Sequence, residues 1–391
     1  MKLGFKDLIS PITVEDFHRN YWDVKFCHLA GQSDRFSHLL TWNALNLILA
    51  HTESLQHLHI VKDGKPIDQP SYVKNGVVAA AKLTGHLREG ATLIFNRISE
   101  VHRPISDIAE EIGRALLCDV SVNLYAAWKT SHGFDVHWDD HDVIILQIHG
   151  DKHWQIYGVV ENRFAQKGSA AANGFCQPPD PIWERTLRPG EVLYIPRGWW
   201  HFARPCDHAV AHLTVGLRPP FGDSFLRWMA KQATQRPELR RHVPLVSDEL
   251  LEKYIAAMKE ALTEMLADSE LGAKYRRWYT EQIEVRPRFS LPHAVDMSLL
   301  QPGARVRILA APRGIPIQAS ADPSEIAVSF DGSVYTFDAA TLPLFQFIDQ
   351  RKNVTLAELC EHWVEEFDQP ELLEFIRLLS TIGLIGVEDL E

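Results

Sequence analysis

Two side chains that commonly bind transition metals, His137 and Asp139, lie two residues apart in the stretch FDVHWDDHDVIILQ at residues 134–147. Because residues i and i+2 of a β-strand point to the same face, we expect the imidazole and the carboxylate to project together. A second histidine, His201, follows 62 residues after Asp139 and ends the stretch GEVLYIPRGWWH. A Pro-Gly turn, a short strand and a second turn precede it, which predicts that His201 lies on a later strand of the same sheet.

Two histidines and one carboxylate on one face form the facial triad of non-haem Fe(II) oxygenases, which leaves coordination positions open for a cosubstrate and O₂. The sequence therefore predicts that His137, Asp139 and His201 are the metal ligands and the catalytic residues. Lys152 lies fifteen residues after His137, on the next predicted strand. A buried cation there would bind a carboxylate of a dicarboxylate cosubstrate, whereas the alternative is a lysine at a surface turn.

Other titratable side chains surround these motifs. Five further histidines are expected to be exposed or hydrogen-bonded within the sheet rather than to bind metal. These are His141, His149, His153, His208 and His212. Asp140 and Asp142 fit two interpretations, as partners that orient a ligand histidine or as solvated carboxylates of a loop.

Short β-like runs separated by Gly, Pro, Asn and Asp fill residues 119–218 and indicate an antiparallel sandwich or barrel. The predicted strands are Val120–Tyr125, Val143–Ile148, His153–Tyr157, Val192–Ile195 and Val210–Leu217. Residues 165–182 have the composition of a long loop. Towards the N-terminus, Thr13 is a candidate helix cap, and two helices within residues 75–115 flank a strand at Ala91–Phe95.

Helical signals replace the strands after residue 221. Ser247 is a candidate N-cap for a helix with an apolar stripe, which either packs on its own domain or serves for oligomerisation. Residues 287–292 have the composition of a linker. A hairpin with an Asp331-Gly332 turn and two helices capped at Thr355 and Asp368 then predict a winged-helix-like unit.

The composition indicates a soluble globular protein of a reducing compartment. Its 391 residues include 40 Lys and Arg against 51 Asp and Glu, a net charge of −11, which argues against direct nucleic-acid binding and suits a basic partner. The five cysteines lack the spacing of a disulfide framework or a zinc site. We find no membrane span and no signal peptide, and we expect a cytoplasmic protein.

The stretches HWDDHDVIILQIHGDKHW at residues 137–154 and LRPGEVLYIPRGWWH at residues 187–201 resemble the JmjC ribosomal oxygenases, also called cupin-4 proteins. These are Fe(II)- and 2-oxoglutarate-dependent protein hydroxylases. The resemblance implies an α+β fold, with a double-stranded β-helix (jelly-roll, cupin/JmjC) barrel and flanking helices at residues 1–220. A helical dimerisation segment at residues 221–286 and a winged-helix-like domain at residues 287–391 would follow. The implied cofactors are Fe²⁺, 2-oxoglutarate and O₂, and the implied assembly is a homodimer.

By the same resemblance, the triad matches the iron ligands and Lys152 matches the residue that pairs with the distal carboxylate of 2-oxoglutarate. Asn123 and Tyr125 match strand positions that line the cosubstrate and substrate pocket, and Thr214 matches a pocket residue on the last strand. Trp138, between the ligands, is larger than the family's residues there. Gly216 stands where the histidine hydroxylases carry Ser.

The target side chain stays open between Arg and His. Residues 215–218, VGLR, look like the bacterial arginine-hydroxylating members, but those members use Arg where this chain has Lys152. We expect hydroxylation of a basic protein, such as a ribosomal protein, with release of succinate and CO₂. The alternatives are a hydroxylase of a peptide natural product or small molecule, and a metal-binding cupin that acts as a sensor or scaffold without catalysis. A zinc hydrolase ranks lower because the chain has no HExxH motif, and histone demethylation ranks lower because it has no chromatin-reading module.

Overall fold

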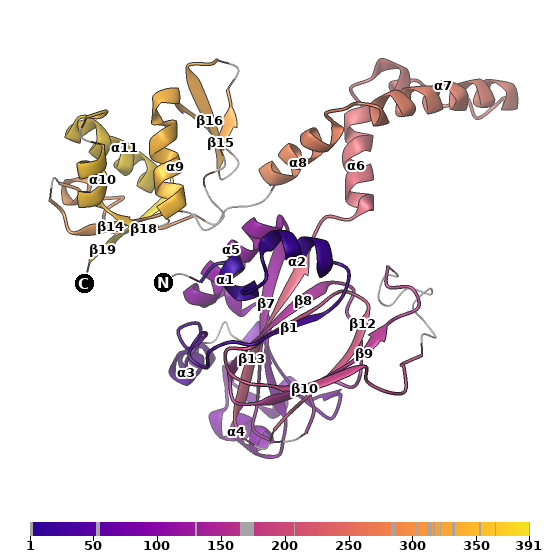
Figure 1. The fold of residues 1–391 in the computed structure, drawn as a ribbon, viewed down its shortest axis with the longest axis vertical. Helices are drawn as coiled ribbons and strands as arrows, with labels where there is room; N and C mark the ends of the chain where they lie inside the picture. Colours follow the sequence, from indigo (N-terminus) through magenta and orange to yellow (C-terminus); the bar gives the residue numbers. More distant parts are fainter. Residues whose placement is uncertain are drawn as a thin grey trace. The chain divides into compact units, whose positions relative to one another are not determined.

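The computed structural model describes residues 3–51, 55–129, 131–164, 176–206, 208–282, 287–301, 303–310, 315, 317–320, 322–330, 333–351, 353–363 and 365–390. The chain divides into two compact units, Met1–Pro219 and Pro220–Glu391. The first unit contains two large β-sheets, a two-stranded sheet and the candidate site, and the second contains helices and a small α/β region (Figure 1).

Two antiparallel sheets form the jelly-roll barrel of the first unit. The larger sheet contains β1 (Cys27–Leu29), β2 (Leu58–Lys62), β3 (Lys65–Pro66), β6 (Thr92–Phe95), β7 (Asp119–Ala127), β8 (Asp142–His149), β11 (Val192–Ile195) and β13 (Val210–Arg218). Its strand order is β1-β11-β8-β13-β7-β6-β2-β3. The smaller sheet has the order β10-β9-β12 and contains β9 (Lys152–Val159), β10 (Trp183–Leu187) and β12 (Trp199–Pro205). All five predicted strands of residues 119–218 are confirmed. His201 lies on a strand as predicted, β12, whereas β10 was not predicted.

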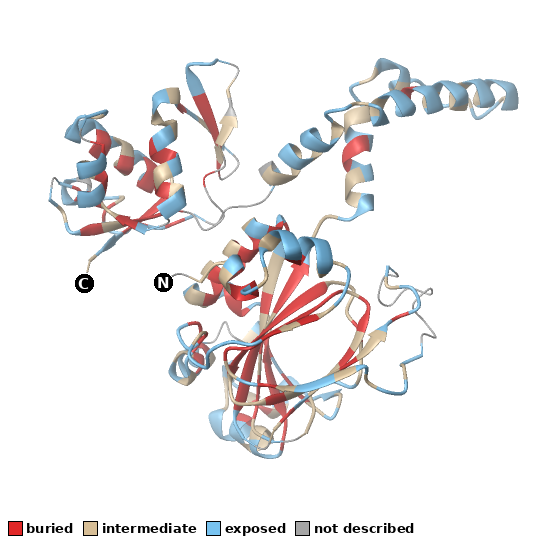
Figure 2. Ribbon diagram, viewed as in Figure 1, coloured by how far each residue is buried: buried red, intermediate tan, exposed pale blue. Residues whose placement is uncertain are grey.

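Strand β8 is buried on both faces of the larger sheet, which explains its uninterrupted apolar run. Ile144 and Leu146 belong to the core between this sheet and the helices. Val143 and Ile145 point the other way, into the cluster between the two sheets. Figure 2 shows much of this sheet in the colour of buried residues. The short edge strand β3 is exposed. Burial on both faces makes β8 a rigid support for the segment that precedes it.

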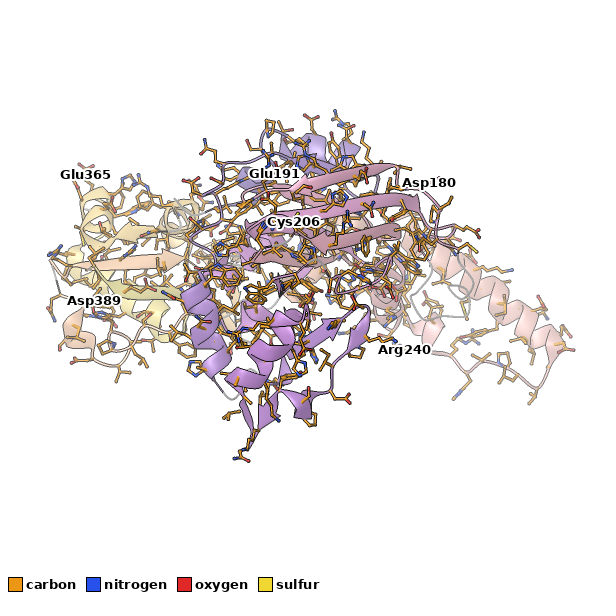
Figure 3. The ribbon with its side chains drawn as sticks, turned by 90° about the horizontal axis from the view of Figure 1, so that it is seen from below. Asp180, Glu191, Cys206, Arg240, Glu365 and Asp389 are labelled. Atoms are coloured by element: carbon orange, nitrogen blue, oxygen red, sulfur yellow. The ribbon has the colours of Figure 1, made fainter. Side chains whose placement is uncertain are left out.

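Helices and a short hairpin complete the first unit. They are α1 (Phe5–Ile9), α2 (Val14–Asn20), α3 (Trp42–Ala50), α4 (Ala80–Arg88) and α5 (Arg103–Leu116), with β4 (Val73–Lys74) and β5 (Val77–Val78). The Thr13 cap is confirmed, because its hydroxyl oxygen accepts a hydrogen bond from Asp16 N at 3.1 Å. Glu191, labelled in Figure 3, pairs with His28 of β1 at 2.9 Å and fastens this edge strand to the turn before β11.

The second unit begins with the helices α6 (Gly222–Ala233), α7 (Asp248–Leu266) and α8 (Leu271–Gln282). Ser247 caps α7 as predicted, since its hydroxyl oxygen accepts from Leu250 N. Aromatic side chains join α6 to α8, with the ring centroids of Trp228 and Tyr275 5.2 Å apart. Within the described parts of the chain, no helix is both long and apolar enough to cross a membrane.

The C-terminal region packs around its own apolar core. Its elements are β14 (Val306–Ala310), β15 (Ile317–Ala319), β16 (Glu325–Phe330), β17 (Ser333–Asp338), α9 (Leu342–Arg351), β18 (Asn353–Thr355), α10 (Leu356–His362), α11 (Gln369–Thr381) and β19 (Ile385–Asp389). The capping boxes that start α10 and α11 are confirmed. The hairpin β16–β17 is present, and its predicted Asp331-Gly332 turn lies outside the described residues.

Residues 287–292 do not form the expected linker. Arg288 and Ser290 are buried, and Arg288 N donates to Gly383 O at 2.8 Å. Ser290 Oγ accepts from Val387 N at 2.9 Å. Proline-rich composition suggested a spacer, but these backbone and hydroxyl hydrogen bonds attach the segment to the C-terminal core.

Candidate active site

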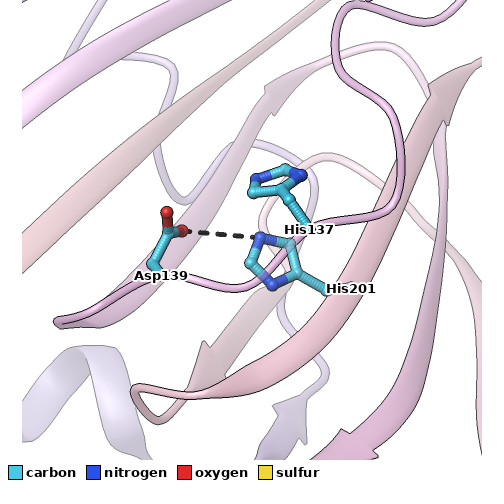
Figure 4. A group of neighbouring side chains, drawn as sticks. All are labelled: His137, Asp139 and His201. Carbon is cyan, nitrogen blue, oxygen red and sulfur yellow. Dashed lines mark ion pairs between the residues drawn. The ribbon is translucent and has the colours of Figure 1, made fainter. Parts of the chain in front are cut away.

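His137, Asp139 and His201 converge inside the barrel, as Figure 4 shows. One ligand atom from each residue lies within 4.8 Å of the others. His201 Nε2 is 3.6 Å from Asp139 Oδ2, and the two imidazole centroids are 4.4 Å apart. The structure therefore brings together the three side chains that the sequence singled out, at spacings that suit ligands of one ion.

The backbone arrangement that achieves this differs from the prediction. His137 and Asp139 do not lie on a regular strand, and His201 lies in β12 of the smaller sheet rather than in the sheet that contains β8. A single antiparallel bridge joins the two segments, with His137 N to His201 O at 3.1 Å and His201 N to His137 O at 2.8 Å. Gly198 N donates to Asp139 O at 2.7 Å. One isolated pair of backbone hydrogen bonds thus brings His137 next to His201, where the spacing predicted strands of a single sheet.

Backbone carbonyls orient both imidazole rings. His137 Nδ1 is 2.7 Å from Asp135 O, and His201 Nδ1 is 2.9 Å from Trp199 O. Because a carbonyl oxygen only accepts hydrogen bonds, Nδ1 carries the proton in each ring. Nε2 is then left with its lone pair, which is the form that binds a metal.

The acidic residues next to the ligands have structural partners. Asp142 is buried and accepts hydrogen bonds from Tyr194 Oη at 2.6 Å and from Arg197 N at 2.9 Å. Burial raises the pKa of the Asp142 carboxyl. Asp140 pairs with His141 at 3.0 Å. Asp142 therefore holds the turn that precedes His201, a role that neither of the two interpretations from sequence included.

A cavity adjoins the triad and contains three of the four predicted cosubstrate residues. Lys152, Tyr125 and Thr214 line it together with the triad. Asn123 is not among the lining residues. Its side chain instead accepts from Arg97 N at 3.0 Å and hydrogen-bonds the Tyr125 hydroxyl. Asn123 therefore acts on the pocket through Tyr125.

Lys152 is buried rather than at a surface turn, and three rings surround its ammonium. Its Nζ is 5.9 Å from the Tyr125 ring centroid, 5.7 Å from that of Trp154 and 3.4 Å from His212 Nδ1. Burial lowers the pKa of Lys152 to about 7. Burial, together with the nearby Asp139 charge, raises the pKa of Tyr125 to about 12.

His212 is a pocket residue that sequence reasoning placed among the ordinary histidines. Its ring stacks on Tyr125, with centroids 4.9 Å apart and an interplanar angle of 8°, and meets the Trp154 ring edge-on. Burial and the Lys152 charge hold the pKa of His212 well below its usual range. The ring is therefore neutral, and Nδ1 accepts the hydrogen bond from Lys152. The sequence contains one signal for this position: His212 lies two residues before Thr214 on one strand, so both side chains point to the same face, towards the pocket.

Residues 97–224 match the family model of the JmjC domain. This part of the chain is a JmjC domain. The JmjC domain contains the triad, Lys152 and His212. Among curated proteins, the chain is 26% identical over 217 residues to the "bifunctional lysine-specific demethylase and histidyl-hydroxylase NO66" of Drosophila grimshawi, covering 54% of this chain and 30% of that protein. The Dictyostelium discoideum protein of the same name is 27% identical over 231 residues, which cover 55% of this chain and 43% of that protein.

The likeness to solved structures extends beyond the JmjC domain. The structure of YcfD, a ribosomal oxygenase from Escherichia coli in complex with cobalt and succinic acid, aligns with a TM-score of 0.60 at 16% identity and covers 97% of this chain and 99% of YcfD. A YcfD complex with cobalt and 2-oxoglutarate aligns with a TM-score of 0.57 at 17% identity, and the alignment covers 97% of this chain and 99% of YcfD. At these identities the alignments establish the shared fold. The chain spans less than a third of the length of the relatives from Drosophila grimshawi, Drosophila pseudoobscura pseudoobscura and Drosophila persimilis.

Proposed function

We propose that the JmjC domain is a Fe(II)- and 2-oxoglutarate-dependent oxygenase that hydroxylates an Arg or His side chain of a basic protein, with a ribosomal protein as the target. The observation that carries the proposal is the meeting of two imidazole nitrogens and one carboxylate within 4.8 Å. Both imidazoles present an unprotonated Nε2, and this donor set is the one that non-haem Fe(II) sites use.

Bound there, Fe(II) supplies the oxidative chemistry by which 2-oxoglutarate, O₂ and a substrate C–H bond become succinate, CO₂ and a hydroxylated product. His137, Asp139 and His201 hold the ion, and their charge of −1 leaves a net positive centre that attracts the dianionic cosubstrate. Lys152 pairs with the distal carboxylate, and the neutral His212 keeps the ammonium in place.

The aromatic walls of the pocket have separate roles in this proposal. Tyr125 keeps its hydroxyl proton at neutral pH, and the rise of its pKa to about 12 extends the protonated form to still higher pH. It is therefore available as a hydrogen-bond donor, and Asn123 fixes its hydroxyl. Trp154 and Phe134 line the same cavity and exclude water from the space next to the ligands. Thr214 offers a hydroxyl on the adjoining strand.

The relatives' names support the substrate class. NO66 proteins are named as lysine-specific demethylases and histidyl-hydroxylases, and YcfD is described as a ribosomal oxygenase with cobalt and 2-oxoglutarate bound in its structure. The net charge of −11 favours approach by basic ribosomal proteins. The same charge argues against direct nucleic-acid binding, and α11 carries Glu371 and Glu374 beside a single arginine, Arg377.

We further propose that residues 221–286 form a dimerisation segment and that residues 287–391 form a winged-helix-like domain. Apolar side chains on and before α7 support the first proposal, since Leu250, Leu266 and Val246 are exposed in the single chain. The hairpin β16–β17 beside α9, α10 and α11 supports the second. A dimeric mass in light scattering that becomes monomeric in a Leu266→Glu variant would support the homodimer. A cytoplasmic location stays a prediction.

The experiment compares intact masses of ribosomal proteins from three strains: wild type, a deletion strain, and a deletion strain that expresses Asp139→Ala. We expect one ribosomal protein to lose the mass of one oxygen atom in the last two strains only. Equal masses in all three strains would refute the ribosomal target. A changed peptide product with unchanged ribosomal proteins would instead support a natural-product hydroxylase.

A further inference from the structure

A second cavity lies on the other side of β6 from the candidate active site, within the first unit. On β6, Thr92 lines the active-site cavity and Leu93 lines the second cavity. Successive residues of a strand point to opposite faces, so the sheet separates the two spaces. The second cavity has a volume of about 640 Å³, which falls within the range of about 300–1,000 Å³ for small-molecule sites.

The walls of this cavity are apolar and come from α3, α4 and the sheet. Their main side chains are Trp42, Leu45, Leu83, Leu87, Leu93 and Trp128. The rings of Trp42 and Trp128 lie 5.6 Å apart. Both tryptophans are only partly buried, so they present apolar area to the hollow. A wall of this kind favours an alkyl or aromatic ligand body.

The charged residues of the lining all have one sign. Arg88 ends α4 and Lys129 follows β7, and both are exposed. Neither makes an ion pair with any described residue, and no described Asp or Glu lines the cavity. Glu89 adjoins Arg88 at the helix cap without lining the cavity. The cavity is therefore bordered by two positive charges that no described residue neutralises, although the chain as a whole has a net charge of −11.

We propose that this cavity binds a small amphipathic carboxylate, such as a medium-chain fatty acid. Its apolar body would lie between the two tryptophans and the leucines, and its carboxylate would pair with Arg88 and Lys129. The charge of the lining selects an anion over a cation, and a neutral lipid would leave both cations unused. This site is independent of the proposed metal chemistry.

The test uses calorimetric titration of the full chain with decanoate, decanol and decyltrimethylammonium. We expect decanoate to bind at one saturable site and about tenfold more tightly than decanol, because a charge-assisted hydrogen bond is worth about 1.5 kcal/mol. The double variant Arg88→Gln/Lys129→Gln should remove this preference while decanol binding stays. The matched control is Lys82→Gln, an exposed lysine of α4 that does not line the cavity.

A cavity-filling variant, Ala80→Trp, should abolish binding of both decanoate and decanol, with folding checked by circular dichroism. Asp139→Ala should bind decanoate as the wild type does. The proposal is overturned by an absence of saturable binding, by equal affinity for the three probes, or by unchanged decanoate affinity in the double variant.

Discussion

Replacement of His212 tests whether this ring positions Lys152 or only fills space. His212→Phe keeps a flat ring in the stack on Tyr125, at a centroid distance of 4.9 Å in the wild type, and removes the acceptor for Lys152 Nζ at 3.4 Å. His212→Asn does the reverse, because its side-chain oxygen is as far along the chain as Nδ1 but no ring remains. The two variants therefore separate hydrogen bonding from packing.

The magnitude follows from the contact. A hydrogen bond from a charged donor is worth about 1.5–3 kcal/mol, and the distance of 3.4 Å between Lys152 Nζ and His212 Nδ1 favours the lower end. At about 1.4 kcal/mol per factor of ten, His212→Phe should bind 2-oxoglutarate about tenfold more weakly at pH 7. Loss of a group that hydrogen-bonds the ammonium also lowers the pKa of Lys152 further, so fewer molecules carry the charge that the dianion needs.

The assay is calorimetric titration of Fe(II)-loaded protein with 2-oxoglutarate in the absence of O₂, together with thermal unfolding. We expect His212→Asn to keep most of the wild-type affinity and to lose thermal stability, and His212→Phe to do the opposite. Wild-type affinity in His212→Phe, or equally weak binding in both variants, would refute a positioning role for His212.

Three further outcomes are expected. In the wild type, the affinity for 2-oxoglutarate should fall up to about tenfold per pH unit above pH 7, because the neutral form of Lys152 must take up a proton to pair with the dianion. Titrations of the Lys152→Arg variant should show no such fall, since a guanidinium stays charged. Asp142→Asn should lower the free energy of unfolding in urea by about 1–3 kcal/mol, because it weakens the hydrogen bonds from Tyr194 and Arg197 to a buried acceptor; no measurable loss would contradict this account. Gly198→Ala should lower the melting temperature and the metal affinity together, because the φ of Gly198 is +76° and an added Cβ would lie 2.5 Å from the Cβ of Arg163. An unchanged melting temperature and metal affinity would show that the turn tolerates the side chain.

The sequence predicted those parts of the fold that depend on local chemistry. Ser247, Thr355 and Asp368 were identified as helix caps because each offers a side-chain acceptor at the start of an apolar period. The sequence predicts β7, β8, β9, β11 and β13 because these segments are rich in β-branched, aromatic and other apolar residues. By contrast, the residue pattern does not predict β10, because Trp183–Leu187 contains two adjacent charged residues and follows a segment of loop-like composition.

The sequence predicts which residues form the site better than it predicts how the backbone brings them together. The ligand types and their spacing pointed to His137, Asp139 and His201, but the bridge between His137 and His201 depends on the register of two segments far apart in the chain. The contact of Lys152 with His212 spans 60 residues and exists only once β9 and β13 face each other across the barrel. Such contacts depend on sheet pairing, which single-residue patterns do not specify.

The most direct test of the central claim is succinate formation from 2-oxoglutarate by the Fe(II)-loaded protein with a ribosomal-protein extract. The account predicts turnover by the wild type and by Asp135→Asn, a matched control that changes an exposed carboxylate next to the site. It predicts no turnover by His137→Ala or Asp139→Ala. Wild-type succinate production by the two ligand variants, or its absence from the wild type, would contradict the claim that these side chains hold a catalytic iron.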